Sequence, residues 1–288
     1  GRGASVAVRV QPSAYDVANP LRAPKDRLAA LVHATGGDDD PAVRILAAAS
    51  PAISIDPQGR LLLDAIQLVQ GGSDSLSCKQ GEAWLDRLVI AGSVARGMTA
   101  ESCTLKLRRG VLTGNKTTAG QFMGGAVHFE NSFITSNGNM QNGAGGIYLG
   151  AGARLEAVYT TWVDNQAAAG TQYSVACDED DDVETVEVRN SVVINKGFNT
   201  LCEGASVTTT AWSTEAPTGS NIAVGFADLG AYLAADVSLM GVYRAIPGSA
   251  LNDLAMWEDG DPTIDFDGDA RPSGNNSPDF AGADRATQ

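Results

Sequence analysis

The segments RLLLD (residues 60–64), EAWLD (82–86), TLKLR (104–108) and AVHFE (126–130) repeat one pattern, and each begins 22 residues after the one before. In every segment the second and fourth residues are apolar and the fifth is charged. Because alternate side chains of a strand point to opposite faces, the pattern predicts one strand-bearing coil in every 22 residues. A further apolar column follows at the same interval, at Leu68, Ile90, Leu112 and Ile134.

A single coil cannot bury its inner face, so the apolar residues of successive coils must stack on one another. A helical repeat would need apolar spacings of three and four over roughly ten or more residues. These runs are instead short and are bounded by Gly, Ser and Asn. We therefore predict an all-β fold, a right-handed parallel β-helix solenoid.

The repeat loosens after residue 137. We expect the next two coils at Leu155 and at Val188, and both intervals, from Phe129 to Leu155 and from Leu155 to Val188, exceed one regular repeat. The extra residues should form two loops, one around Asn139 and one around Asp180. Asparagines follow four of the strands, and we expect them to stack as a ladder at a coil corner that needs a left-handed backbone: Asn115, Asn137, Asn165 and Asn195.

Three regions are predicted along the chain. Residues 1–40 hold a strand beginning at Ser5 and an amphipathic helix from Pro24 to His33, which would cap the open end of the solenoid. Residues 41–216 form the coils. Residues 217–288 form an irregular C-terminal capping segment packed on the solenoid.

Composition excludes some partners. The 288 residues carry a formal net charge of −14, which repels phosphate backbones and anionic lipid surfaces. We therefore expect no nucleic-acid partner, and no apolar stretch is long enough for a membrane span. The opening residues GRG contain no initiator Met and no signal-peptide core, so we expect a processed form or a fragment.

The four cysteines form two pairs, Cys78 with Cys103 and Cys177 with Cys202, and the spacing within the two pairs is identical. We predict two local disulfides, with buried free thiols as the alternative. Disulfides would indicate an oxidising, extracellular compartment.

Several segments resemble a known family. GGAVHF (124–129), GGIYL (145–149), NSFITSN (131–137) and NSVVIN (190–195) look like coils of pectate-lyase-like β-helix proteins of bacterial surfaces. The tail segments PGSALN, DFDGDARP and PDFAGAD resemble the closing region of secreted β-helix proteins of the choice-of-anchor type. The resemblance covers residues 41–288 and implies a secreted or cell-surface protein. Arg285 replaces the usual closing acidic residue, and no anchor helix follows.

Two acidic stretches are candidate calcium sites. Within residues 178–182, Asp178, Asp180 and Asp182 offer ligands, with Arg189 or Lys196 as the base of a polysaccharide lyase. A solvated loop is the alternative. Asp265, Asp267 and Asp269 have the alternate spacing of a calcium loop, but Gly268 and Asn276 exclude an EF-hand, and a simple Asp-Gly turn is the favoured interpretation.

Aromatic side chains are sparse but could bind sugars. Of the four tryptophans, we expect Trp162 and Trp212 to be the candidates for stacking on a glycan, while Trp84 and Trp257 offer the same chemistry. Packing in the core is the alternative for all four. His128 should point outward between Val127 and Phe129.

The sequence therefore predicts a non-catalytic extracellular structural or adhesive module without a cofactor, which presents its loops to a polysaccharide or to another surface protein. It could also be a homo-oligomer or a filament subunit. The competing hypothesis is a calcium-dependent polysaccharide lyase. The segments Gly-His-Gly and Arg-Ile-Lys, which a polygalacturonase-like hydrolase needs, are absent from the sequence.

Overall fold

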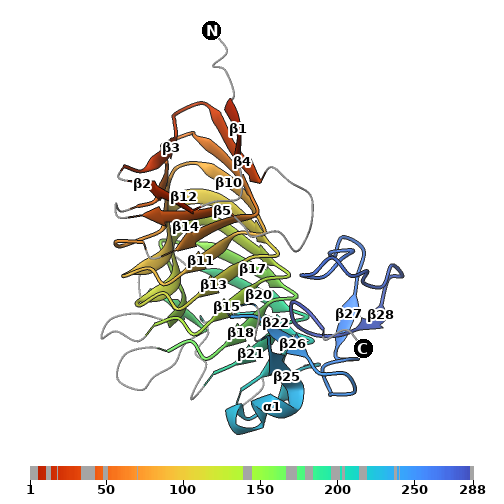
Figure 1. The fold of residues 1–288 in the computed structure, drawn as a ribbon. Coiled ribbons are helices and arrows are strands. Elements are labelled where there is room, and N and C mark those ends of the chain that lie inside the picture. Colours follow the sequence, from red (N-terminus) through yellow and green to blue (C-terminus); the bar gives the residue numbers. More distant parts are fainter. Residues whose placement is uncertain are drawn as a thin grey trace.

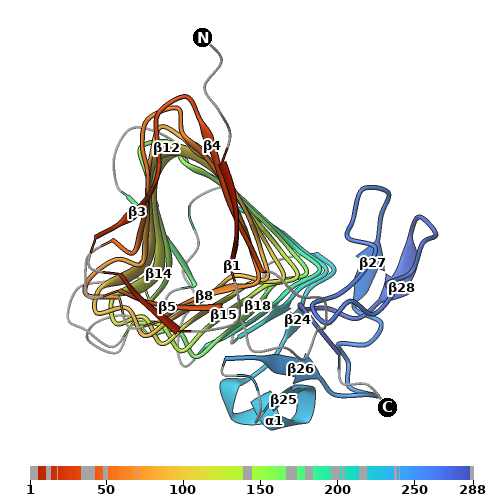
Figure 2. The same ribbon diagram turned by 45° about the horizontal axis from the view of Figure 1, so that its top comes forward.

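The computed structural model shows a stack of parallel β-coils with a triangular cross-section (Figures 1 and 2). This confirms the predicted β-helix, because the strands of the solenoid pair in parallel with the equivalent strands of the neighbouring coils. The structure describes residues 6–10, 14–17, 19–33, 43–47, 51–69, 71–138, 145–166, 174–178, 184–195, 202, 205–213, 219–236, 239 and 241–285.

Three faces make up the solenoid. Face A contains β3 (Leu21–Ala23), β6 (Ile53–Ile55), β9 (Leu76–Lys79), the first halves of β12 (Arg96–Arg108) and β14 (Thr118–Glu130), β16 (Gly145–Gly150) and β19 (Val175–Cys177). Face B contains β1 (Val6–Val10), β4 (Leu28–His33), β7 (Arg60–Asp64), β10 (Glu82–Asp86), the second halves of β12 and β14, β17 (Arg154–Val158), β20 (Thr185–Arg189) and β22 (Ser206–Thr208).

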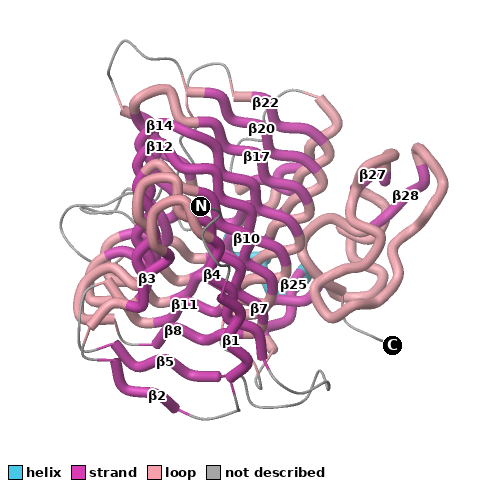
Figure 3. The backbone as a smooth tube through the Cα atoms, turned by 90° about the horizontal axis from the view of Figure 1, so that it is seen from above, coloured by secondary structure: helices cyan, strands magenta, loops and turns pink. Residues whose placement is uncertain are grey.

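Face C is the third side of the triangle. It contains β2 (Ala14–Val17), β5 (Val43–Ala47), β8 (Ile66–Val69), β11 (Val89–Ala91), β13 (Val111–Thr113), β15 (Phe133–Thr135), β18 (Thr161–Val163), β21 (Val192–Ile194), β23 (Ala211–Trp212) and β24 (Ile222–Ala223). Figure 3 shows the first four of these strands, β2, β5, β8 and β11, side by side.

The interior columns follow the predicted regular repeat and then two longer intervals. Phe129 pairs with Ala157, and Ala157 pairs with Val188, so both of these coils are longer than the regular ones. The predicted start at Leu155 was therefore wrong by one inward-facing position, because Leu155 stacks on Val127 and not on Phe129. Both positions point inward, so the apolar pattern alone could not separate them.

The predicted helix from Pro24 to His33 was also wrong. Asp26 has a left-handed φ of 58°, which a helix cannot continue through, and residues 28–33 form β4 instead. β4 pairs with β1 and β7, so the coils begin at Val6 and not at residue 41. Leu28 pairs with Arg60 across an interval much longer than the regular repeat. A search for the regular repeat in the sequence therefore does not detect this coil.

The predicted asparagine ladder is present at the corner after face C. The Asn115 side chain donates to Asn137 over 2.8 Å, and Asn137 donates to Asn165 over 2.9 Å. The Asn195 side chain accepts from the backbone N–H of Asn165. The left-handed residues, however, are those just before the ladder, namely Gly114, Ser136 and Asp164.

Both predicted disulfides are present. Cys78 of β9 pairs with Cys103 of β12, and Cys177 of β19 pairs with Cys202. The first pair joins neighbouring coils at the edge of face A. The loop around Asn139 lies outside the described residues, as does the one around Asp180.

The C-terminal segment lies beside the stack, along face C and the corner between faces B and C (Figures 1 and 2). It contains a 3-10 turn (Phe226–Asp228), α1 (Leu229–Tyr232), β25 (Leu233–Ala235) paired with β26 (Tyr243–Ala245), and β27 (Ala255–Trp257) paired with β28 (Ser277–Asp279). Strands β13, β15, β18 and β21 are buried on both faces because this segment covers their outer side. A second apolar core therefore joins the segment to the solenoid.

Arg271 is the centre of this attachment. Its buried guanidinium donates to Asn131 at a coil corner, to Asp279 over 2.9 Å and to the carbonyl of Gly282. It also lies between the rings of Tyr159 and Phe280, 3.8 and 4.2 Å from their centroids. One cation thus joins the solenoid to β28 and to the residues that follow it.

Replacing Asn137 by Ala should lower the free energy of unfolding by roughly 2–4 kcal/mol, since the ladder partners on both sides lose a buried hydrogen bond. Urea unfolding measures the change. As a control, Asn275→Ala removes an exposed asparagine and should cost less than about 0.5 kcal/mol. Equal losses in the two variants would contradict the ladder's role.

Arg271→Met should destabilise the protein by about 3–5 kcal/mol, because it leaves the Asp279 carboxylate buried without its cation. Limited proteolysis should then release the C-terminal segment before the solenoid is cleaved. Arg285→Met is the matched control, since Arg285 is exposed and its guanidinium lies 5.5 Å from the centroid of the Phe280 ring. If both variants resist protease like the parent protein, Arg271 does not anchor the segment.

Candidate functional site

One tryptophan lies on the outer surface of face B. Trp84 of β10 stands between buried Ala83 and Leu85, so its side chain points away from the core. It is 43% exposed, and its neighbours in the adjoining coils are Leu62 and Lys106. An exposed indole on a flat strand surface has the shape and polarity to stack on a sugar ring.

A groove of about 320 Å³ lies beside this tryptophan, at the corner between faces A and B. It spans three coils, and Glu82 and Thr104 of its wall are on the same outer face as Trp84. The full lining is Gln58, Gly59, Arg60, Gln80, Gly81, Glu82, Ser102 and Thr104. We call this lining together with Trp84 the corner groove.

Backbone geometry shapes the corner groove. Gln58, Gln80 and Ser102 are equivalent turn residues with left-handed φ values of 62°, 50° and 53°. Glycine follows two of them because the chain passes very close: a Cβ on Gly59 would lie 2.6 Å from the Ala23 carbonyl oxygen. The tight turn leaves the amide and hydroxyl side chains on the outside.

Most polar side chains of the corner groove are available to form hydrogen bonds with a ligand. Gln58, Gln80, Ser102 and Thr104 are exposed, and their side chains make no hydrogen bond within the part of the chain that the structure describes. The two charges, on Arg60 and Glu82, face each other with 3.5 Å between Nε and Oε2. The groove therefore offers neutral donors and acceptors with little net charge.

An ionic network lies one coil beyond Trp84 on face B. Lys106 and Arg108 both bind Glu130, over 3.0 and 2.9 Å. His128 is on the same outer surface, as predicted, with its two ring nitrogens 3.5 Å from Glu130 and 3.2 Å from Glu156. The cations nearest to Trp84 on this side are thus engaged by a carboxylate.

Glu130 is an unsuitable proton donor. Burial alone would raise its pKa, but hydrogen bonds from His128 and Lys106 and the charges of Lys106 and Arg108 lower the pKa to about 2. The carboxylate is therefore ionised at neutral pH and acts as an acceptor. This contradicts a role as the general acid of a glycoside hydrolase.

The remaining charges around Trp84 are paired as well. Asp64 accepts three hydrogen bonds from Arg87, and Asp86 accepts from Arg109 with 2.9 Å between Nε and Oδ1. Each pair joins one coil to the next at the corner after face B. Trp84 is therefore surrounded by mutually neutralised side chains.

Two predicted stacking residues are in the core instead. Trp162 and Trp212 continue the interior column that contains Leu68, and their exposed fractions are 0% and 3%. The regular repeat does not predict this register, because the coils that carry Trp162 and Val193 are longer than the regular ones. Neither ring can reach a glycan, so the assignment of these residues as stacking candidates was wrong.

The predicted lyase residues do not form a site in the described chain. Arg189 binds buried Asp261 of the C-terminal segment over 2.9 Å. Burial opposes the charge on Arg189, but hydrogen bonding with Asp261 outweighs it and raises the pKa, which opposes action as a base. Asp178 follows β19, while Asp180, Asp182 and Lys196 lie outside the described residues.

The second calcium candidate is a turn. Asp265 accepts from the backbone N–H of Asp269 over 2.9 Å, and Asp267 forms an ion pair with Arg244. Among the residues described, no three His, Cys, Asp or Glu side chains converge in a way that would hold a metal ion. The three aspartates therefore do not form the predicted calcium loop.

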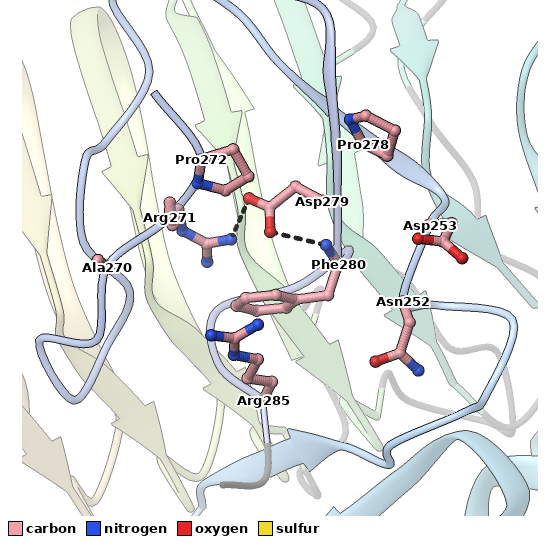
Figure 4. Close-up of a pocket in the computed structure, with 9 residues that line it drawn as sticks. All are labelled: Asn252, Asp253, Ala270, Arg271, Pro272, Pro278, Asp279, Phe280 and Arg285. Carbon is pink, nitrogen blue, oxygen red and sulfur yellow. Dashed lines mark hydrogen bonds and ion pairs between the residues drawn. The ribbon is translucent and has the colours of Figure 1, made fainter. Parts of the chain in front are cut away.

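A second hollow, of about 510 Å³, lies in the C-terminal segment (Figure 4). Figure 4 shows Asp279 between Arg271 and the backbone of Phe280, and Arg285 beside the Phe280 ring. The Asn252 amide donates to the carbonyls of Ile246 and Ser249. Most polar groups that line this hollow thus form hydrogen bonds within the C-terminal segment itself.

No membrane-spanning helix is found among the described residues. No family model matches the sequence, and no curated protein matches it. Among solved structures, the chain is similar to pectate lyase Pel9A, with 12% identity, a TM-score of 0.42 and coverage of 97% of this chain and 88% of that one.

A second similar structure is the catalytic unit of the thermostable GH87 α-1,3-glucanase from Streptomyces thermodiastaticus strain HF3-3. It shares 11% identity with a TM-score of 0.21, over 75% of this chain and 61% of that one. At these values neither similarity bears on function, and the assignment of the fold rests on the strand pairing described above.

Proposed function

We propose that the protein is an extracellular, non-catalytic β-helix module that binds a neutral polysaccharide in the corner groove. The observation that carries the proposal is the exposed Trp84 beside a groove of unpaired amide and hydroxyl side chains. Sugars are bound by this combination, in which an aromatic face packs on the ring and neutral polar groups bond the hydroxyls.

The groove extends along the solenoid, because equivalent residues of three coils line it. Successive coils are about 4.8 Å apart, so a linear polymer lying along the axis would meet a similar set of groups at each coil. This geometry favours an extended glycan chain over a compact small molecule.

Charge favours a neutral polymer over a uronate polymer. The net charge of −14 repels polyanions, and the cations around Trp84 are each engaged by a carboxylate. A polysaccharide lyase would need a free base near bound calcium, whereas Arg189 is paired with Asp261. We therefore prefer binding over catalysis.

An extracellular location is supported by the two disulfides, which persist in oxidising compartments. The resemblance of the closing segment to secreted β-helix proteins agrees with export of the protein. The bound polysaccharide would then be part of a surface layer or of a neighbouring cell's coat.

Trp84→Ala should weaken binding to a neutral polysaccharide by at least about tenfold, because the stacking platform is lost. Affinity electrophoresis in gels containing xylan, galactomannan or soluble glucan measures the retardation, and polygalacturonate serves as the anionic comparison. Gln80→Ala should weaken binding to a smaller extent.

Leu239→Ala is the matched control, since Leu239 is equally exposed on the C-terminal segment at 43%. Its retardation should equal that of the parent protein. The proposal fails if no neutral polymer retards the parent protein, or if the Trp84 and Leu239 variants behave alike. Release of unsaturated oligosaccharides from polygalacturonate would instead establish a lyase.

A further inference from the structure

Five charged side chains meet where the end of the described chain joins β26 and the turn at residues 265–269. Arg244 of β26 forms ion pairs with Asp236, Asp267 and Asp284. Asp265 lies on the other side of Asp284, and these two carboxyl groups are in hydrogen-bonding contact. Three stretches of the C-terminal segment are thus joined at one point.

Asp265 and Asp284 are both about 1% exposed, and each has one oxygen already occupied. Asp265 Oδ1 accepts from Asp269, and Asp284 Oδ2 accepts from Arg244. The remaining oxygens, Asp265 Oδ2 and Asp284 Oδ1, are buried and have no hydrogen-bond donor. Two carboxylate oxygens cannot bond each other unless a proton lies between them.

We propose that Asp265 and Asp284 hold one proton between them at neutral pH, and that this shared proton fastens the end of the chain to the turn at residues 265–269. The bond satisfies both buried oxygens and removes one negative charge from the cluster. The attachment of the C-terminal segment is thereby coupled to pH.

The charges around the pair support this. Burial first, then the charges of Asp265 and Asp267, raise the pKa of Asp284 to about 8, against the opposing charge of Arg244. Burial also raises the pKa of Asp265, although Arg271 opposes it, and Asp269 adds to the negative charge.

The sign of the pH effect follows from these shifts. A carboxyl whose pKa is higher in the folded protein than in the unfolded chain stabilises the fold at low pH and loses that contribution as pH rises. The stabilisation is lost as the pH rises from 3.8, the ordinary pKa of an aspartate, to about 8, the pKa of Asp284 in the folded protein. The segment is therefore held most tightly in mildly acidic surroundings.

A divalent cation between the two carboxylates is the competing occupant. Calcium needs about six to eight oxygen ligands, whereas two carboxyl oxygens are unpaired here, and Arg244 already supplies positive charge. A proton needs only the two. The geometry therefore favours the proton.

Urea unfolding of the parent protein and of Asp284→Asn between pH 5 and 9 in EDTA tests the proposal. An asparagine amide donates to Asp265 at every pH, so it imitates the protonated pair. The unfolding constant of the parent, divided by that of the variant, should rise by up to about tenfold per pH unit until about pH 8.

Asp267→Asn is the matched control. It removes another charge that binds Arg244, from a side chain that is partly exposed, and it should keep the pH-dependent step but move its midpoint to lower pH. A structural role alone would not shift a midpoint. Parallel pH profiles for the parent and Asp284→Asn would overturn the proposal.

Two measurements on the parent protein complete the test. The ¹³C resonance of the Asp284 carboxyl should titrate with a midpoint well above that of an exposed aspartate. Replacing EDTA by calcium at pH 8 should leave stability unchanged. A normal midpoint would overturn the shared proton, and stabilisation by calcium that Asp284→Asn abolishes would establish a metal site in its place.

Discussion

In-register stacking of side chains between parallel coils is the interaction on which the rest of the structure depends. Each coil contributes only three short strands, and none of them can bury an apolar face without its neighbours. The columns through Leu63, Leu85, Leu107 and Phe129 form the core because the backbone pairing holds equivalent residues side by side. The asparagine ladder repeats the same arrangement with hydrogen bonds.

The same stacking sets the outer surface. Because Trp84 lies directly between two buried column residues, its outward direction follows from the register and not from local packing. The corner groove arises likewise, since Gln58, Gln80 and Ser102 occupy one turn position in successive coils. Face C is the exception over β13, β15, β18 and β21, because the C-terminal segment buries the outer residues of these strands.

The regular coils could be predicted from the sequence because their apolar columns recur without insertions. The helix from Pro24 to His33 could not be rejected, since Leu28, Leu31 and Val32 suit either a helix face or a buried strand. What decides between them is pairing with β7, a long-range contact that no local pattern reveals. The cysteine spacing did predict both disulfides.

The candidate site was harder to find than the fold. Trp162 and Trp212 were expected to stack on a glycan, but their pairing with Ile134 and Val193 places both rings in an interior column. Trp84, in contrast, lies at an outward-facing position of a regular coil. The repeat therefore predicts that its aromatic side chain is exposed on the surface. The Asp265–Asp284 contact joins residues whose approach depends on the tail folding back, so spacing gave no signal for it.

Measuring the register between β14 and β17 tests the in-register stacking most directly, because both the core and the outer surface depend on this register. Introducing Ala126→Cys together with Arg154→Cys places the two thiols on directly paired residues, within disulfide range. Mild oxidation followed by mass spectrometry should show nearly complete cross-linking of that pair, and little for His128→Cys with Arg154→Cys. The reverse result would mean that Leu155 stacks on Phe129 instead of Val127, and would contradict the stacking described above.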